Sequence, residues 1–221
     1  MFKFQSCFRS ATFALAGTLL SAVAAQAAPQ TLSFNVSARF AARDARDGSL
    51  AAEQSLDARV SAKGNRARVE TSFSDRPVVL ILAPPYVYRL LPQAKAGVRY
   101  RVGEGASNQL TAANIAAFLR DPKELRAILK RGGAKQSGAQ VVAGQRLEVW
   151  TATQFAGRPA QVKAWLRPSD ALPARLQVSS KTVSLSASWR DYKKGAPLPD
   201  TLFSVPSGFK VREAADNVSP L

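Results

Sequence analysis

The chain has no histidine, and its single cysteine, Cys7, lies close to its beginning. Without histidine there is no side chain that ordinarily titrates near neutral pH, no Ser-His-Asp arrangement and no imidazole ligand for a metal. If the segment 1–27 is removed, disulfide formation, thiol catalysis and cysteine metal sites are excluded as well. An enzyme would then depend on carboxylates or a lysine, and the spacing of the carboxylates brings no two of them together. We therefore expect no enzyme activity, no catalytic residue and no metal site.

The segment 1–27 has the order of a secretory signal. Lys3 and Arg9 form a positive head, residues 11–25 are almost wholly apolar, and Ala25-Gln26-Ala27 offers small residues where a signal peptidase reads them. The apolar run is short for a membrane span, so an uncleaved anchor helix is the weaker alternative. We expect cleavage of residues 1–27 and a single domain, residues 28–221, that is soluble in the periplasm.

The chain is strongly basic, with a formal net charge of +16. Removal of the segment 1–27 takes away Lys3 and Arg9 and no acidic residue, which lowers the charge from +16 to +14. Such a protein is attracted to anionic surfaces such as phospholipid head groups or lipopolysaccharide, although solubility alone also explains the charge. Nothing in the chain resembles a nucleic-acid-binding module, and we expect no nucleic-acid partner.

Alternation of apolar and polar residues dominates the chain after residue 30. It predicts a strand over residues 31–40. The turn signals Asp47-Gly48 and Lys63-Gly64-Asn65 come before the next two strands, 50–60 and 66–73, and the three strands form an antiparallel meander. The run 78–82 is continuously apolar, which indicates a strand covered on both faces. The remaining predicted strands are residues 86–91, 98–102, 145–155, 161–167, 174–180, 182–192 and 209–211.

The period changes to that of a helix in the middle of the chain. Residues 111–119 predict a short helix, and Asp121-Pro122-Lys123-Glu124 is a specific start for a second one, which Gly132-Gly133 ends. The basic face of the second helix is either simply solvated or touches an anionic membrane. We expect an α+β fold that is mainly antiparallel β: a strongly curved open sheet, or incomplete barrel, of about ten strands, with this inserted helical pair covering its concave face.

Such an arrangement encloses a groove of the kind that holds hydrophobic ligands. Aromatic side chains on a sheet are usually core, but some of them would line this groove, and the side of the sheet that each tryptophan occupies stays open. The candidate groove and lid residues are Phe34, Phe73, Leu80, Tyr88, Ile115, Phe118, Leu119, Leu125, Ile128, Leu129 and Trp165.

Four stretches share a pattern with one known group of proteins. They are LDARVSAKGNRARVET at 56–71, VVLILAPPYVYRLLPQAKAGVRY at 78–100, VKAWLRPSDALPARLQV at 162–178 and LPDTLFSVPSGFKV at 198–211. The pattern resembles that of the LolA-like superfamily, the periplasmic carriers and sorting proteins of outer-membrane lipoproteins, with the RseB-type regulator as a cousin. The resemblance implies an incomplete barrel that holds acyl chains beneath helices, without catalysis or cofactor. It also implies an arginine that ties the lid closed, and Arg68 is the candidate for it.

We therefore expect a periplasmic, non-catalytic protein that holds lipid or lipoprotein acyl chains between the curved sheet and the helical lid, for envelope lipid or lipoprotein transport or sorting. One alternative is an envelope-sensing regulatory or interaction module with an envelope protein as its partner. Another is a binder of anionic envelope polymer, or of an anionic membrane surface through the basic helix face. A co-purifying lipid, a protein partner without lipid transfer, and salt-sensitive binding would distinguish the three.

Overall fold

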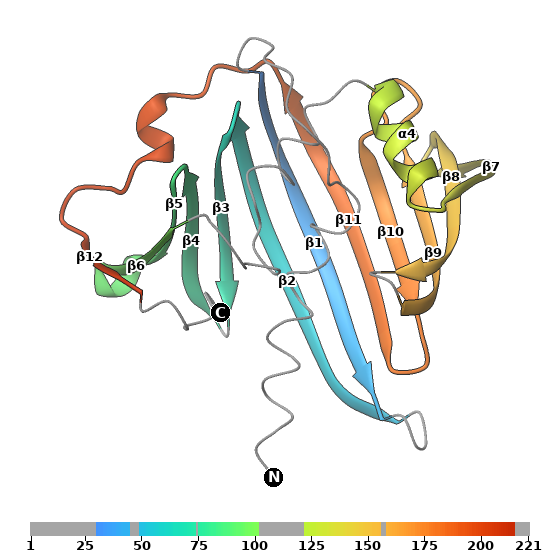
Figure 1. The fold of residues 1–221 in the computed structure, drawn as a ribbon, viewed down its shortest axis with the longest axis horizontal. Coiled ribbons are helices and arrows are strands. Elements are labelled where there is room, and N and C mark those ends of the chain that lie inside the picture. Colours follow the sequence, from blue (N-terminus) through green and yellow to red (C-terminus); the bar gives the residue numbers. More distant parts are fainter. Residues whose placement is uncertain (1–29, 45–48, 74, 102–121, 156–157, 215–221) are drawn as a thin grey trace. The chain divides into compact units, whose positions relative to one another are not determined.

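The computed structural model describes residues 30–44, 49–73, 75–101, 122–155 and 158–214, and most of these belong to twelve β-strands (Figure 1). The alternating pattern of the sequence produces these strands, because every second side chain can then face an apolar layer. The strands are β1 (Thr31–Arg43), β2 (Leu50–Lys63), β3 (Arg66–Phe73), β4 (Arg76–Ala83), β5 (Tyr86–Leu91), β6 (Ala96–Arg101), β7 (Lys135–Val142), β8 (Gln145–Phe155), β9 (Arg158–Leu166), β10 (Pro173–Ser179), β11 (Val183–Lys194) and β12 (Lys210–Glu213).

The strands are hydrogen-bonded in the order β12-β6-β5-β4-β3-β2-β1-β11-β10-β9-β8-β7, so β12 and β7 end an open sheet. Pairing is antiparallel from β2 to β6 and from β11 to β7, and parallel between β6 and β12. The prediction of an open, mainly antiparallel sheet is confirmed. The described helical elements are α4 (Pro122–Arg131) and the 3₁₀ turns η1 (Pro92–Ala94) and η3 (Asp200–Phe203).

Contacts between residues divide the chain into two compact units. The first unit contains the beginning of β1, the end of β2, the strands β3 to β6, and the C-terminal segment from residue 191 onward. The second contains the remainder of β1 and β2, with α4, β7 to β10 and most of β11. That residues 28–221 fold as one domain stays a prediction, as does the curvature of the sheet.

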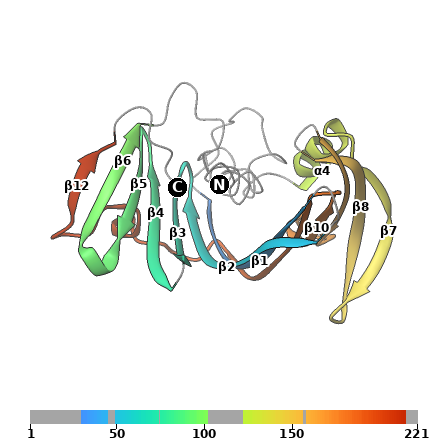
Figure 2. The same ribbon diagram turned by 90° about the horizontal axis from the view of Figure 1, so that it is seen from below.

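In the first unit, β4 is buried on both faces, as its continuous apolar run predicted. Figure 2 shows β3, β4, β5, β6 and β12 as neighbours in this unit. Val79 and Ile81 of β4 form a buried cluster with Leu90 of β5, and the C-terminal segment packs on this cluster. Leu80 and Leu82 face the other side of the strand and are equally buried. The C-terminal segment therefore covers one face of these strands.

Two parts of the expected architecture need correction. The helical pair is not supported, because the described part of the chain contains a single α-helix, α4. The other predicted helix, residues 111–119, lies outside the described residues, as does the predicted signal, residues 1–27. The structure also has more strands than the expected ten. The strand without any counterpart in the prediction is β7, whose residues are almost all exposed and so carry no alternating apolar pattern.

Candidate functional site

One face of β8, β9, β10 and β11 in the second unit is apolar. The register pairs Trp150 with Ala164, Ala164 with Leu176, and Leu176 with Ala187. Directly paired residues point to the same side of a sheet, so these four side chains form one row across four strands, and each is 6% exposed or less. The row and its buried neighbours form what we call the apolar face of the second unit. Those neighbours are Val162, Leu166, Val178 and Leu185.

The helix α4 is fastened beside this face by a pair of opposite charges. The Arg126 Nε donates to Glu148 Oε2 at 2.9 Å, and Nη2 donates to Glu148 Oε1 at 2.7 Å and to the Pro168 carbonyl at 2.6 Å. Glu148 lies two residues before Trp150 in β8, so both side chains are on the same side of the strand. We call the Arg126–Glu148 pair the α4 latch; Figure 1 shows α4 next to β8.

The latch is partly shielded from water, with side-chain exposures of 24% for Arg126 and 17% for Glu148. The hydrogen bonds from Arg126 lower the pKa of Glu148 below its usual range. The indole N–H of Trp150, which donates to Glu148 at 3.3 Å, also lowers this pKa, whereas burial of the carboxylate raises it. Leu129 of α4 is buried as well. The helix is thus joined to β8 by side-chain contacts.

A second apolar face, in the first unit, ends in positive charge. Because paired residues share a side of the sheet, the register defines one row across six strands. The row consists, in order, of Val60, Val69, Leu80, Arg89, Val98 and Arg212. The first three side chains are buried and aliphatic, whereas Arg212, on the terminal strand β12, is exposed. We call this set the Val60–Arg212 row; it places an apolar surface next to two guanidinium groups.

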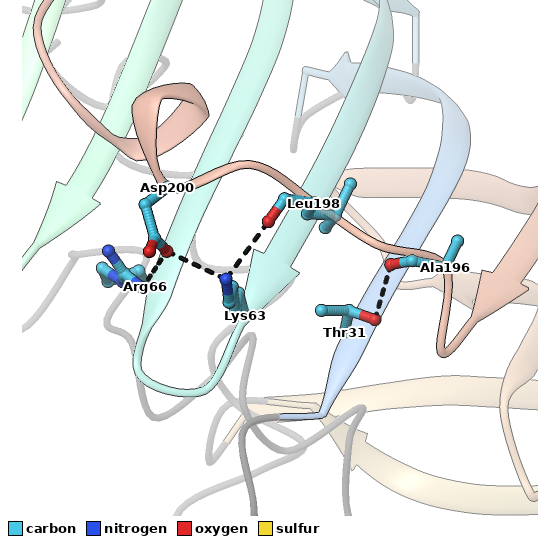
Figure 3. Close-up of polar contacts among 6 residues, drawn as sticks. All are labelled: Thr31, Lys63, Arg66, Ala196, Leu198 and Asp200. Atoms are coloured by element: carbon cyan, nitrogen blue, oxygen red, sulfur yellow. Dashed lines mark hydrogen bonds and ion pairs between the residues drawn. The ribbon is translucent and has the colours of Figure 1, made fainter.

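The opposite face of the first unit is covered by the C-terminal segment. Asp200, at the start of η3, accepts hydrogen bonds from Lys63 Nζ at 2.9 Å and from Arg66 Nη2 at 2.6 Å (Figure 3). These two donors lower the pKa of the Asp200 carboxyl below its usual range. The guanidinium of Arg66 also lies 5.4 Å from the ring centroid of Phe203, which is buried. The segment is thus held by charge and by an aromatic anchor.

Arg68, the predicted lid-closing residue, contacts this same C-terminal segment. Its Nη1 donates to the Leu202 carbonyl at 3.4 Å, and its Nε donates to Glu70 at 2.9 Å. The hydroxyl of Thr31 contacts an earlier part of the same segment, by donating to the Ala196 carbonyl at 2.8 Å (Figure 3). A lid-closing role for Arg68 stays a prediction.

Two of the predicted groove residues lie on the sides opposite to the apolar faces described above. Tyr88 packs with the cluster of Val79 and Leu90, on the side that the C-terminal segment covers. Trp165 packs with Val149, and its indole N–H donates to Gln140 at 3.0 Å. Tyr88 and Leu80 therefore lie on opposite faces of the sheet, and so do Trp165 and Trp150. The sequence had left the side of each tryptophan open.

The remaining predicted site residues are divided between described and undescribed parts of the chain. Phe34 is buried, and its ring centroid lies 5.4 Å from that of Tyr192. Leu80 belongs to the Val60–Arg212 row and Leu129 to α4. The ligand-binding roles of all these residues stay predictions. Outside the description lie the side chains of Phe73, Leu125 and Ile128, and the whole of Ile115, Phe118 and Leu119.

The α4 latch was not predicted from the sequence. From the sequence, Arg126 belongs with Lys123, Lys130 and Arg131 to the basic face of the second predicted helix, and no motif includes Glu148. The available signal was a lone carboxylate between Leu147 and Val149, in a strand whose side chains are otherwise uncharged from that point to Phe155. A charge in such a position needs a partner when it is partly buried. The partner itself could not be identified without the register.

The described residues offer no group of three or more acidic side chains that could hold a metal ion. In that same part of the chain, no helix has both the length and the apolar character needed to cross a membrane.

Comparison with known proteins shows similarity in structure alone. No family model and no curated protein matches the chain. It is similar to the crystal structure of an uncharacterized conserved protein from Thermus thermophilus, with a TM-score of 0.54 and 13% identity over 83% of this chain and 90% of that one. At this identity the similarity is one of fold.

Two further solved structures align with lower scores. A LolA superfamily protein from Nitrosomonas europaea has a TM-score of 0.40 and 16% identity, over 79% of this chain and 90% of that one. Lipoprotein LppX from Mycobacterium tuberculosis has a TM-score of 0.44 and 13% identity, over 88% and 96%. One of these structures is thus of a LolA superfamily protein, the group that the sequence resembles, and membership of this chain in that superfamily stays a prediction.

Proposed function

We propose that the protein is a non-catalytic binding protein that holds lipid acyl chains on an apolar sheet face beneath α4. The observation that carries this proposal is the apolar face of the second unit, with a short helix fastened beside it by the α4 latch. Aliphatic and aromatic side chains bind acyl chains through the hydrophobic effect, which needs no catalytic group. Opening of a charged latch would admit a ligand while the sheet stays intact.

The Val60–Arg212 row, in the first unit, is a second surface, and it suits an amphiphilic ligand with a negative head group. An acyl chain fits the aliphatic side chains of Val60, Val69 and Leu80, and the guanidinium groups of Arg89 and Arg212 favour a phosphate or carboxylate. The predicted export signal and the resemblance to the LolA-like superfamily support action in the periplasm, in the transport or sorting of envelope lipids or lipoproteins.

The test is whether a lipid co-purifies with the protein. The chain would be expressed with its own predicted signal, purified from the periplasm without detergent, and measured by native mass spectrometry with lipid extraction. We expect a bound diacyl or triacyl species that is lost on delipidation. A mass without ligand, in a protein that unfolds cooperatively in urea, would contradict the proposal.

Substitution of Leu129 tests the position of the ligand. Leu129→Lys would put a charge under α4 and is expected to abolish lipid retention, whereas Leu129→Met conserves volume and is the matched control. Urea unfolding of both variants separates loss of ligand from loss of fold. If Leu129→Lys folds and keeps its lipid, the acyl chain does not lie beneath α4.

Contact with an anionic membrane surface is a second candidate, because exposed lysine and arginine remain on α4. Arg126 is engaged in the latch, but Lys130 and Arg131, in the last turn of α4, are exposed. Co-sedimentation with vesicles that contain anionic phospholipid measures this binding. It should weaken with salt, since exposed charges are screened within about 8–10 Å at physiological ionic strength.

A further inference from the structure

The strand β7 ends the sheet and exposes nearly all of its side chains. Seven of its eight residues are exposed, and the eighth, Val142, is half-buried. Among the described residues, β7 is paired along one side only, with β8. The other side of β7 therefore presents backbone groups at an edge of the sheet.

The hairpin geometry identifies which backbone groups these are. Ala143 and Gly144 join β7 to β8 with φ of 47° and 77°, as in a two-residue type I′ turn. The closing pair of such a hairpin, Val142 and Gln145, exchanges both of its hydrogen bonds, and bonded and non-bonded pairs then alternate along the strands. Val141 and Ala139 therefore direct their N–H and C=O groups outward.

This edge has few of the features that prevent a strand from pairing with another chain. Natural edges are commonly blocked by proline, by charged side chains or by bulges. Residues 136–142 contain no proline and no charged residue, and the bulge of β7 lies only at its beginning, between Gln136 and Gly138. Val141 is 66% exposed. The outer side of residues 139–142 suits the addition of an extended strand.

The charge around β7 indicates the kind of strand that fits. Residues 130–146 contain Lys130, Arg131, Lys135 and Arg146, all of them exposed, and no acidic residue. The carboxylate next in sequence, Glu148, is already paired with Arg126. The local field is therefore positive, which favours an acidic segment and opposes the approach of the same edge from a second copy of the chain.

We propose that the outer edge of β7 binds an extended, acidic segment of a partner protein by strand addition. The N–H and C=O groups of Ala139 and Val141 provide the backbone hydrogen bonds, and the surrounding lysines and arginines select for acidic side chains. This function does not depend on lipid binding, because the backbone groups of β7 do not belong to the apolar face of the second unit. Two of the four surrounding cations, Lys130 and Arg131, lie in the last turn of α4.

A proline substitution at the outward-facing position tests the proposal. Ala139→Pro removes the outward N–H and places the ring at the edge, while the pairing with β8 does not use that N–H. Ala139→Val keeps the N–H and is the matched control. The probe is a fluorescent ten-residue peptide of alternating Glu and Val, compared with a Lys and Val peptide of the same pattern, and binding is read by fluorescence anisotropy.

We expect the acidic peptide to bind the wild-type protein and Ala139→Val, and to bind Ala139→Pro at least about ten-fold more weakly. The basic peptide should not bind. Equal affinity for Ala139→Pro, or no binding of the acidic peptide to the wild type, would overturn the proposal. So would sedimentation of the wild type as a dimer that Ala139→Pro abolishes, because the edge would then bind a second copy.

Hydrogen exchange provides a measurement that does not depend on the folding of Ala139→Pro. In the wild-type protein, the acidic peptide should slow amide exchange at Ala139 and Val141, whose N–H groups point outward. The amides of Gln140 and Val142, which face β8, should change less. Unchanged exchange at Ala139 and Val141 under saturating peptide would also refute strand addition.

Discussion

The α4 latch makes a quantitative prediction, which a double-mutant cycle on Arg126 and Glu148 can test. Arg126→Gln and Glu148→Gln each remove one charge and retain most of the side-chain volume. A hydrogen bond to a charged group contributes about 1.5–3 kcal/mol, whereas an exposed ion pair contributes about 0–1 kcal/mol. The latch has two such bonds between side chains that are 24% and 17% exposed, so we expect a coupling energy of about 2 kcal/mol.

The assay is urea unfolding of the wild type, the two single variants and the double variant, combined with hydrogen exchange. A loss of about 2 kcal/mol of local stability corresponds to about 30-fold faster exchange of the α4 amides through local opening. The amides of β3 and β4, in the other unit, should exchange at unchanged rates. This pattern would show that the latch holds the helix and does not merely support the fold.

A pair in the same unit serves as the control. Arg39 Nε lies 3.2 Å from Glu53 Oε1, but these side chains are 73% and 45% exposed. The equivalent cycle on Arg39 and Glu53 should give a coupling energy below about 0.5 kcal/mol. If the coupling of Arg126 with Glu148 is no larger than that of the control, the latch does not fasten α4, and the reasoning from its burial is wrong.

Three further predictions follow from the described contacts. The pKa of Glu148 is lowered in the folded protein, so the contribution of this carboxylate to stability is complete above its usual pKa of about 4.3 and is lost as the pH falls through the lowered value. The difference in unfolding free energy between wild type and Glu148→Gln should therefore shrink on acidification. A difference that does not change with pH would contradict this. Gly97→Ala would bring a Cβ within 2.6 Å of Leu90 Cδ2 and 2.9 Å of the Arg89 carbonyl, so urea unfolding should show a loss of about 1–3 kcal/mol. Phe203→Ala removes a buried ring and should cost about 3–5 kcal/mol in the same assay, whereas a loss below about 1 kcal/mol would mean that the C-terminal segment is not anchored by this residue.

Most strands could be predicted because burial on one face leaves an alternating pattern in the sequence. Residues 31–40 alternate between buried and more exposed side chains over much of their length, and the run 78–82 is buried on both faces as expected. The turn at Lys63-Gly64-Asn65 also separates β2 from β3 as predicted. These features are local, so a single sequence contains them.

The features that escaped prediction depend on which strands are neighbours. The strand β7 has polar and exposed side chains, so its place in the sheet comes from pairing with β8 and leaves no apolar period. The latch joins Arg126 to Glu148, 22 residues away, and only the packing of α4 shows that the helix lies on the side of β8 that carries Glu148. Neither relation can be inferred from spacing along the chain.

The C-terminal segment distinguishes the two faces of the strands in the first unit, because it packs on one of them. A strand such as β4, apolar on both sides, needs a partner layer on each side. Phe203 and the ion pairs of Asp200 hold the chain's own C-terminal segment against one of these sides, where Tyr88 also packs. Tyr88 is half-buried there, and its role in ligand binding stays a prediction. On the other side of β4, which carries Leu80, the Val60–Arg212 row leads from aliphatic residues to arginines. The proposal of a lipid on the first unit therefore concerns this side, since the C-terminal segment packs on the other.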